Sequence, residues 1–60
     1  MKKEFWEGAY RAAGKAALGI HYGKPVYTIS AAEDRKKALM EFASETWIEI
    51  YKDNKWTRLL

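Results

Sequence analysis

The C-terminal segment 46–60, TWIEIYKDNKWTRLL, constrains the fold more than any other part of the chain. Two stretches rich in β-branched and aromatic residues flank Asp53 and Asn54, and such stretches are typical of β-strands. When glycine is absent, Asp and Asn best tolerate the left-handed backbone that a tight hairpin turn requires. The segment therefore predicts a β-hairpin with strands 46–51 and 55–60.

The length of the turn decides which side chains share a face of this hairpin. A two-residue loop pairs Tyr51 with Trp56 and Glu49 with Arg58. A three-residue loop, with Asn54 as its left-handed residue, would move Trp56 to the opposite face. We favour two residues, because Lys-Asp-Asn-Lys is symmetric about its centre and this register sets opposite charges across the strands. The remaining predicted pairs are Lys52 with Lys55, Ile50 with Thr57, Ile48 with Leu59 and Trp47 with Leu60.

This register divides the hairpin into an apolar face and an aromatic face. Turning the aromatic face inward would bury Glu49 and Arg58, a charge pair whose attraction often fails to repay its desolvation. We therefore expect the apolar face to meet the core and the aromatic face to be at least partly open. The apolar face carries Ile48, Ile50, Thr57 and Leu59, and the aromatic face carries Trp47, Glu49, Tyr51, Trp56, Arg58 and Leu60.

Residues 3–18 show the spacing of an amphipathic helix, because apolar residues recur at intervals of three and four. The predicted helix ends at Leu18 if Gly19 provides the C-terminal cap, or at Tyr22 if Gly23 does. Its apolar stripe comprises Phe5, Trp6, Ala9, Ala12, Ala13, Ala16 and Ala17, and its polar side comprises Glu4, Glu7, Arg11 and Lys15.

The middle of the chain predicts a short strand followed by a second helix. The strand is PVYTIS, residues 25–30, which alternates and is rich in β-branched and aromatic residues. Ser30 and Glu33 have the spacing of a capping box at a helix start. The second helix would span residues 31–44, with Ala31, Ala38, Leu39, Phe42 and Ala43 on its buried face.

These elements predict an α+β fold in the order helix, strand, helix, strand, strand (αβαββ). A sheet of about three strands would carry both helices on one face. No repeat or linker divides the chain, so we expect a single domain over residues 1–60.

Composition narrows the classes of protein further. The chain has no cysteine and one histidine, so we expect no disulfide, metal or cofactor, and homodimerisation remains open. The longest apolar run, residues 16–20, is far shorter than the roughly 20 residues of a membrane span. Charged residues interrupt the segment that a signal peptide would need. We expect a cytoplasmic protein without membrane contact.

The aromatic face is the candidate functional site. Trp, Tyr and Arg dominate binding hot spots, so Trp47, Tyr51, Trp56 and Arg58 are the candidate partner-binding residues. In the purely structural alternative, Tyr51 and Trp56 form a cross-strand pair that stabilises the hairpin, and Trp47 covers the base of the sheet.

We expect a non-enzymatic binding module that contacts a protein partner through this face or through a free sheet edge. The short, cysteine-free chain with its aromatic hairpin resembles small phage- or plasmid-encoded inhibitors of host proteins. The alternative is nucleic-acid binding, consistent with the formal charge of +3, in which bases stack on the same aromatics. A designed sequence without a biological role is the third hypothesis. No nucleophile, base and electrostatic stabiliser stand together, so an enzyme is not expected. The phosphate contacts of the alternative would be Lys24, Lys52, Lys55 and Arg58.

Overall fold

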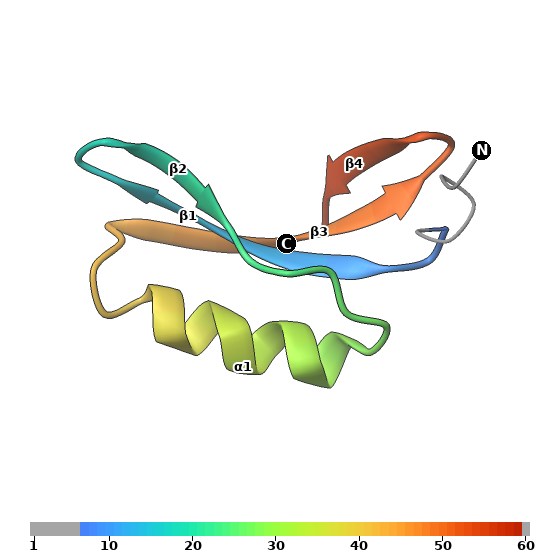
Figure 1. Cartoon of the computed structure of the whole chain (residues 1–60), viewed down its shortest axis with the longest axis horizontal. Helices are drawn as coiled ribbons and strands as arrows, with labels where there is room; N and C mark the ends of the chain where they lie inside the picture. Colours follow the sequence, from blue (N-terminus) through green and yellow to red (C-terminus); the bar gives the residue numbers. More distant parts are fainter. Residues whose placement is uncertain (1–6, 60) are drawn as a thin grey trace.

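The computed structural model describes residues 7–59, in which two β-hairpins and one helix form a single layered unit. The strands make a four-stranded antiparallel sheet with the order β2-β1-β3-β4. The helix lies against one face of the sheet, and the two outer strands bend away from it (Figure 1). The elements are β1 (Tyr10–Ala16), β2 (Gly19–Tyr22), α1 (Ile29–Leu39), β3 (Glu45–Lys52) and β4 (Lys55–Arg58).

The prediction of two helices on a three-stranded sheet is wrong, because β1 and β2 replace the helix predicted over residues 3–18. β1 is a central strand, covered by α1 on one face and by side chains of the outer strands on the other. Its middle residues Ala12, Ala13 and Gly14 are buried on both faces. Such a strand needs small side chains. Alanine is small but is also the best helix former, so the recurring alanines of this segment predicted a helix. Residues 3–6 of the predicted helix lie outside the described residues.

The two strands of the first hairpin are joined where the predicted helix was expected to end. Ala17 and Leu18 form the loop between the paired residues Ala16 and Gly19. Gly19 has φ +134°, a conformation that side-chain-bearing residues rarely adopt. The glycine expected to cap a helix therefore closes a hairpin.

The strand predicted over residues 25–30 is reduced to a single bridge. Val26 and Tyr10 exchange two backbone hydrogen bonds of 2.8 and 2.7 Å. The helix then begins earlier than predicted, because the Thr28 hydroxyl accepts a hydrogen bond from the Ala31 N–H at 3.1 Å. Thr28 is the N-cap in place of Ser30.

The helix also ends earlier than the predicted residue 44. After Leu39 the chain tightens, and the Phe42 N–H donates to the carbonyl three residues back at 3.1 Å. Phe42 therefore lies beyond α1 and is 57% exposed, so its predicted core role is wrong. Of the other predicted core residues, Ala38 is exposed while Ala31, Leu39 and Ala43 are half-buried, and the fully buried residue of α1 is Ala32.

The predicted C-terminal hairpin and its two-residue loop are confirmed. Asp53 and Asn54 have φ 53° and 66°, and Tyr51 pairs with Trp56 in the register expected. The face that carries Ile48 meets α1, and Ile48 is the one large side chain among the described residues that is fully buried. The predicted pair of Trp47 with residue 60 falls outside the described residues.

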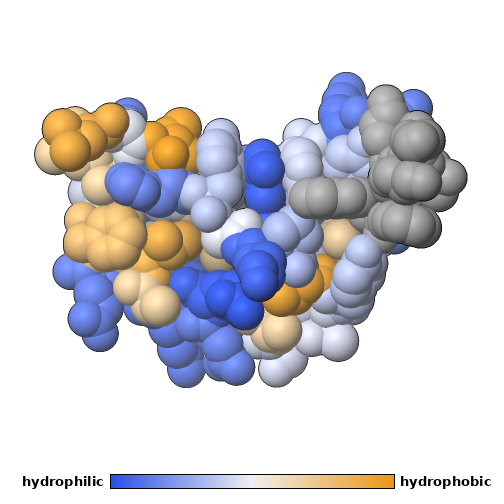
Figure 2. All heavy atoms as spheres, in the orientation of Figure 1, coloured by the Kyte–Doolittle hydropathy of each residue, from blue (hydrophilic) through white to orange (hydrophobic). Residues whose placement is uncertain are grey.

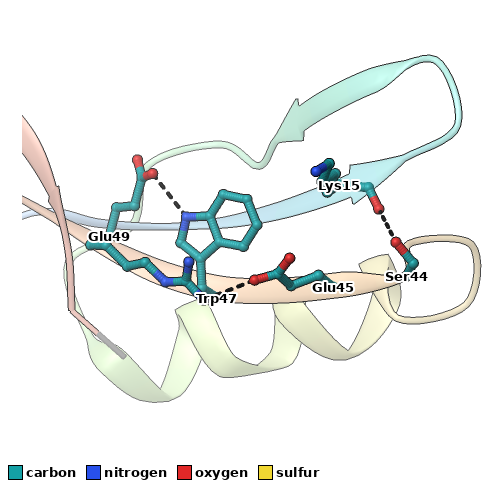
Figure 3. Close-up of polar contacts among 6 residues, drawn as sticks. Lys15, Ser44, Glu45, Trp47 and Glu49 are labelled. Carbon is teal, nitrogen blue, oxygen red and sulfur yellow. Dashed lines mark hydrogen bonds and ion pairs between the residues drawn. The ribbon is translucent and has the colours of Figure 1, made fainter.

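The connection from α1 to β3 packs closely on β1. A Cβ atom added at Gly14 would lie 2.9 Å from the Ala43 Cβ and 3.4 Å from the Leu39 Cβ. The Ser44 N–H and hydroxyl both donate to the Lys15 carbonyl, at 2.8 and 3.1 Å (Figure 3). The absence of a side chain at residue 14 therefore sets how near the helix layer comes to the sheet.

Candidate functional site

The sheet face opposite α1 carries the aromatic residues predicted as the site. Paired residues on antiparallel strands point to the same side, so the register assigns the members of this open face. The two outer strands bend toward this face, away from α1 (Figure 1). The open face comprises Arg11, Ala13 and Lys15 of β1, Ile20 and Tyr22 of β2, Glu45, Trp47, Glu49 and Tyr51 of β3, and Trp56 and Arg58 of β4.

Arg11 lies at the centre of the open face. Its Nε donates to Oε1 of Glu49 at 2.7 Å. Its guanidinium carbon lies 3.9 Å from the ring centroid of Tyr22 and 4.4 Å from that of Trp56. Aromatic ring faces attract cations, and the attraction grows when water is excluded. One guanidinium therefore joins the two outer strands, which are not neighbours in the sheet.

The carboxylate that pairs with Arg11 has a second partner. Oε2 of Glu49 accepts a hydrogen bond from the indole N–H of Trp47 at 2.9 Å (Figure 3). Both oxygens of this half-buried group are thus engaged, which offsets the cost of removing a charge from water. The Trp47 ring is held against the sheet as a result.

A second arginine repeats this arrangement nearer to solvent. The guanidinium carbon of Arg58 lies 4.6 Å from the Trp47 ring centroid, and its Nη2 donates to Oε2 of Glu45 at 3.2 Å. Tyr51 and Trp56 meet edge to face, with ring centroids 5.2 Å apart. Arginines, carboxylates and aromatic rings thus alternate across the open face.

The structure brings the four predicted site residues together but buries two of them. Trp47 and Tyr51 are each 8% exposed, Trp56 is half-buried and Arg58 is exposed. The expectation of a partly open aromatic face therefore holds for Trp56 and Arg58 and not for Trp47 or Tyr51. The purely structural alternative, with a cross-strand aromatic pair and a tryptophan covering the sheet, matches this geometry.

Part of the exposed apolar surface lies on the first hairpin, which the sequence pattern assigned to a helix. Leu18 is 97% exposed at the turn, Ile20 is 48% exposed and Tyr22 is 51% exposed. Apolar side chains gather at the end of the molecule where this turn and the C-terminal end of α1 lie (Figure 2). The rings of His21 and Phe42 meet edge to face at 5.3 Å, which links β2 to the segment after α1.

The outer edge of β2 presents backbone groups as well as side chains. His21 pairs with Gly14, and the Gly23 N–H donates to the Ala12 carbonyl at 2.7 Å. Because bonding alternates along an antiparallel strand, the N–H and C=O groups of Ile20 and Tyr22 point away from β1. Within residues 7–59, no strand pairs with β2 on that side.

The net charge of the chain is concentrated around the same hairpin. Residues 8–32 contain Arg11, Lys15 and Lys24 but no acidic residue, whereas the rest of the chain has equal numbers of acidic and basic residues. Arg11 is paired with Glu49, while Lys15 and Lys24 are exposed. The edge strand β2 is thus uncharged itself and flanked by cations.

Residues 7–59 show none of three further features, namely a pocket, a group of metal ligands and a membrane-spanning helix. They enclose no pocket, and their His, Asp and Glu side chains form no group that could hold a metal ion. Their helix is neither long nor apolar enough to cross a membrane. Comparison with models of protein families, with curated proteins and with solved structures found no match for the chain.

Proposed function

We propose that the protein is a non-enzymatic binding module that docks on a partner protein by pairing β2 with a strand of that partner. The observation that carries this proposal is the outer edge of β2, where outward backbone groups and exposed apolar side chains coincide. Edge strands without charged residues or proline readily pair with other chains, and β2 has neither. In strand addition, the backbone bonds provide affinity and the alternating side chains provide specificity.

The side chains of this hairpin suit such docking. Leu18 is almost fully exposed at a hairpin tip, where it adds nothing to the protein's own core and is available to fill an apolar pocket. Tyr22 is held by the Arg11 guanidinium, so little side-chain freedom would be lost on binding. The hairpin is therefore ordered before it meets a partner.

Nucleic-acid binding through the open face has less support. Base stacking needs accessible ring faces, but Arg11 lies over Tyr22 and Trp56, and Arg58 lies over the Trp47 ring. Both arginines are also paired with carboxylates, which weakens any attraction for phosphate. These contacts favour a protein partner.

The substitution Ile20→Pro tests the proposal, because the Ile20 N–H points away from β1. Proline would remove a donor that a partner strand needs while leaving the hydrogen bonds between β1 and β2 in place. Ile20→Thr is the matched control, since it keeps both the N–H and the β-branched shape.

The parent and both variants would be immobilised and exposed to a lysate of the cell that makes the protein, at about 0.15 M salt. We expect the parent and Ile20→Thr to retain the same protein, and Ile20→Pro to lose it while melting cooperatively. Equal retention by a folded Ile20→Pro variant would contradict the proposal.

A further inference from the structure

The cations around β2 restrict the kind of strand that can pair with it. Lys15 lies directly opposite Ile20 on β1, on the open face, and Lys24 follows β2 by two residues. A partner strand on the outer edge of β2 would lie two strands from β1, at about 10 Å. The long side chains of lysine and glutamate together span that distance, so acidic residues on such a strand could reach Lys15.

The opposite side of β2 is apolar. His21 points to the side of the sheet that α1 covers, as its cross-strand partner Gly14 does, and its ring meets that of Phe42. Phe42 is exposed there. Successive residues of an incoming strand would therefore meet Ile20 and Tyr22, with Lys15 one strand further in, on one side, and His21 and Phe42 on the other.

We propose that the strand recognised by β2 is an extended segment of another protein that alternates acidic and apolar residues. This inference rests on the strand addition proposed above and names the chemistry of the partner. The carboxylates face Lys15 and Lys24, the aliphatic stems of the acidic residues pack on Ile20 and Tyr22, and the apolar residues meet His21 and Phe42.

A second copy of the chain does not satisfy this requirement. Pairing β2 with itself would bring two basic hairpins together, and residues 8–32 of neither copy contain an acidic residue that could offset this charge. The other edge strand, β4, carries Lys55 and Arg58 and no acidic residue. The acidic residues Glu45 and Glu49 lie on β3, which is central in the sheet. Neither sheet edge of the described chain supplies an acidic strand.

Binding of three synthetic peptides tests the inference. The first is an eight-residue peptide with blocked ends that alternates glutamate with valine. The second alternates lysine with valine, and the third has the composition of the first with its glutamates and valines in two blocks. A single-stranded thymidine oligonucleotide is the fourth probe, because it presents negative charge without a strand-forming backbone.

Affinity and backbone amide exchange would be measured by NMR on the full-length protein. We expect the alternating acidic peptide to bind at least about tenfold more tightly than the lysine and block peptides. At saturation it should slow amide exchange at Ile20 and Tyr22, whose N–H groups then become hydrogen-bonded. In the double variant Lys15→Gln and Lys24→Gln, the preference for the acidic peptide over the lysine peptide should be lost, because the cations that flank β2 are removed without placing a carboxylate opposite Glu45.

The outcomes separate this inference from the strand-addition proposal. If both alternating peptides bind equally, and Ile20→Pro abolishes both, strand addition stands and the acidic preference is refuted. If no peptide binds, the acidic-strand inference is overturned. Tighter binding of the oligonucleotide, without protection of Ile20 and Tyr22, would overturn it in favour of nucleic-acid recognition.

Discussion

Replacing Arg11 with methionine tests whether the open face is held together by its central cation, and Arg58→Met is the matched control. Both arginines lie on the same face, and each contacts one tryptophan ring and one carboxylate. They differ in burial, because the side chains of Arg11 and Glu49 are 20% and 12% exposed while those of Arg58 and Glu45 are 53% and 51% exposed. The comparison therefore tests the combined effect of excluding water and of the additional contact between Arg11 and the Tyr22 ring.

The expected losses of unfolding free energy follow from these contacts. Methionine keeps most of the aliphatic stem of Arg11, so the loss is mainly that of the charge. Two cation–ring contacts contribute about 0.5–1 kcal/mol each, and more when desolvated. Leaving the Glu49 carboxylate without its cation lowers the free energy of unfolding by about 1–3 kcal/mol. The sum is about 2–5 kcal/mol for Arg11→Met. For Arg58→Met it is about 1 kcal/mol, because an exposed ion pair contributes little.

Urea unfolding followed by far-ultraviolet circular dichroism would measure both losses. A domain of this size has a total stability of roughly 3–9 kcal/mol, so Arg11→Met should lower the midpoint severely and Arg58→Met slightly. Adding Glu49→Gln to Arg11→Met should restore part of the loss, since it removes the stranded charge. Similar midpoints for the two arginine variants, or no recovery in the double variant, would refute this reasoning.

Five further substitutions test the packing and the helix cap by the same unfolding measurement. Gly14→Ala should destabilise by about 1–3 kcal/mol, because the added methyl group would lie 2.9 Å from the Ala43 Cβ, and an unchanged midpoint would show that the helix layer yields easily. Ile48→Ala should cost about 2–5 kcal/mol, whereas Phe42→Ala, at an exposed side chain, should cost under about 1 kcal/mol. A larger loss for Phe42→Ala than for Ile48→Ala would contradict the assignment of Ile48 to the core. Thr28→Ala should cost about 1 kcal/mol through loss of the helix cap and Ser30→Ala within about 0.5 kcal/mol, so equal effects would contradict the assigned cap.

The C-terminal hairpin was predictable because local and long-range signals agree there. Asp53 and Asn54 suit the left-handed turn, the flanking residues favour strands, and the charge pair Glu49 and Arg58 selects the register. The same reasoning could not show that Trp47 and Tyr51 would be buried. The same face carries Arg11 and Tyr22, which belong to strands assigned to a helix.

The fold of the N-terminal half was not predictable from helical spacing, because its small residues are required by tertiary packing and not by a helix. Ala13 is small since the side chains of Tyr22 and Trp47 flank it on the paired strands, and Gly14 is small since α1 approaches it. Helix propensity favours alanine whatever the neighbours, so tertiary pairing overrides it here. Two signals were nevertheless present in the sequence. The four glycines between residues 8 and 23 are unusual for a helix, and the basic residues of 8–32 have no acidic counterparts.

The Arg11 guanidinium, which contacts both Tyr22 and Trp56, couples the edge strand β2 to the opposite edge strand β4. Any shift of β2 that moves the Tyr22 ring must disturb the guanidinium beside it, and the Trp56 indole on the far strand would sense that change. Tryptophan emission depends on nearby charge. Trp56 is therefore an intrinsic fluorophore on β4 that is coupled through Arg11 to the edge strand β2. Binding of a partner at the edge of β2 would change the fluorescence emission of Trp56 on β4 without an added label.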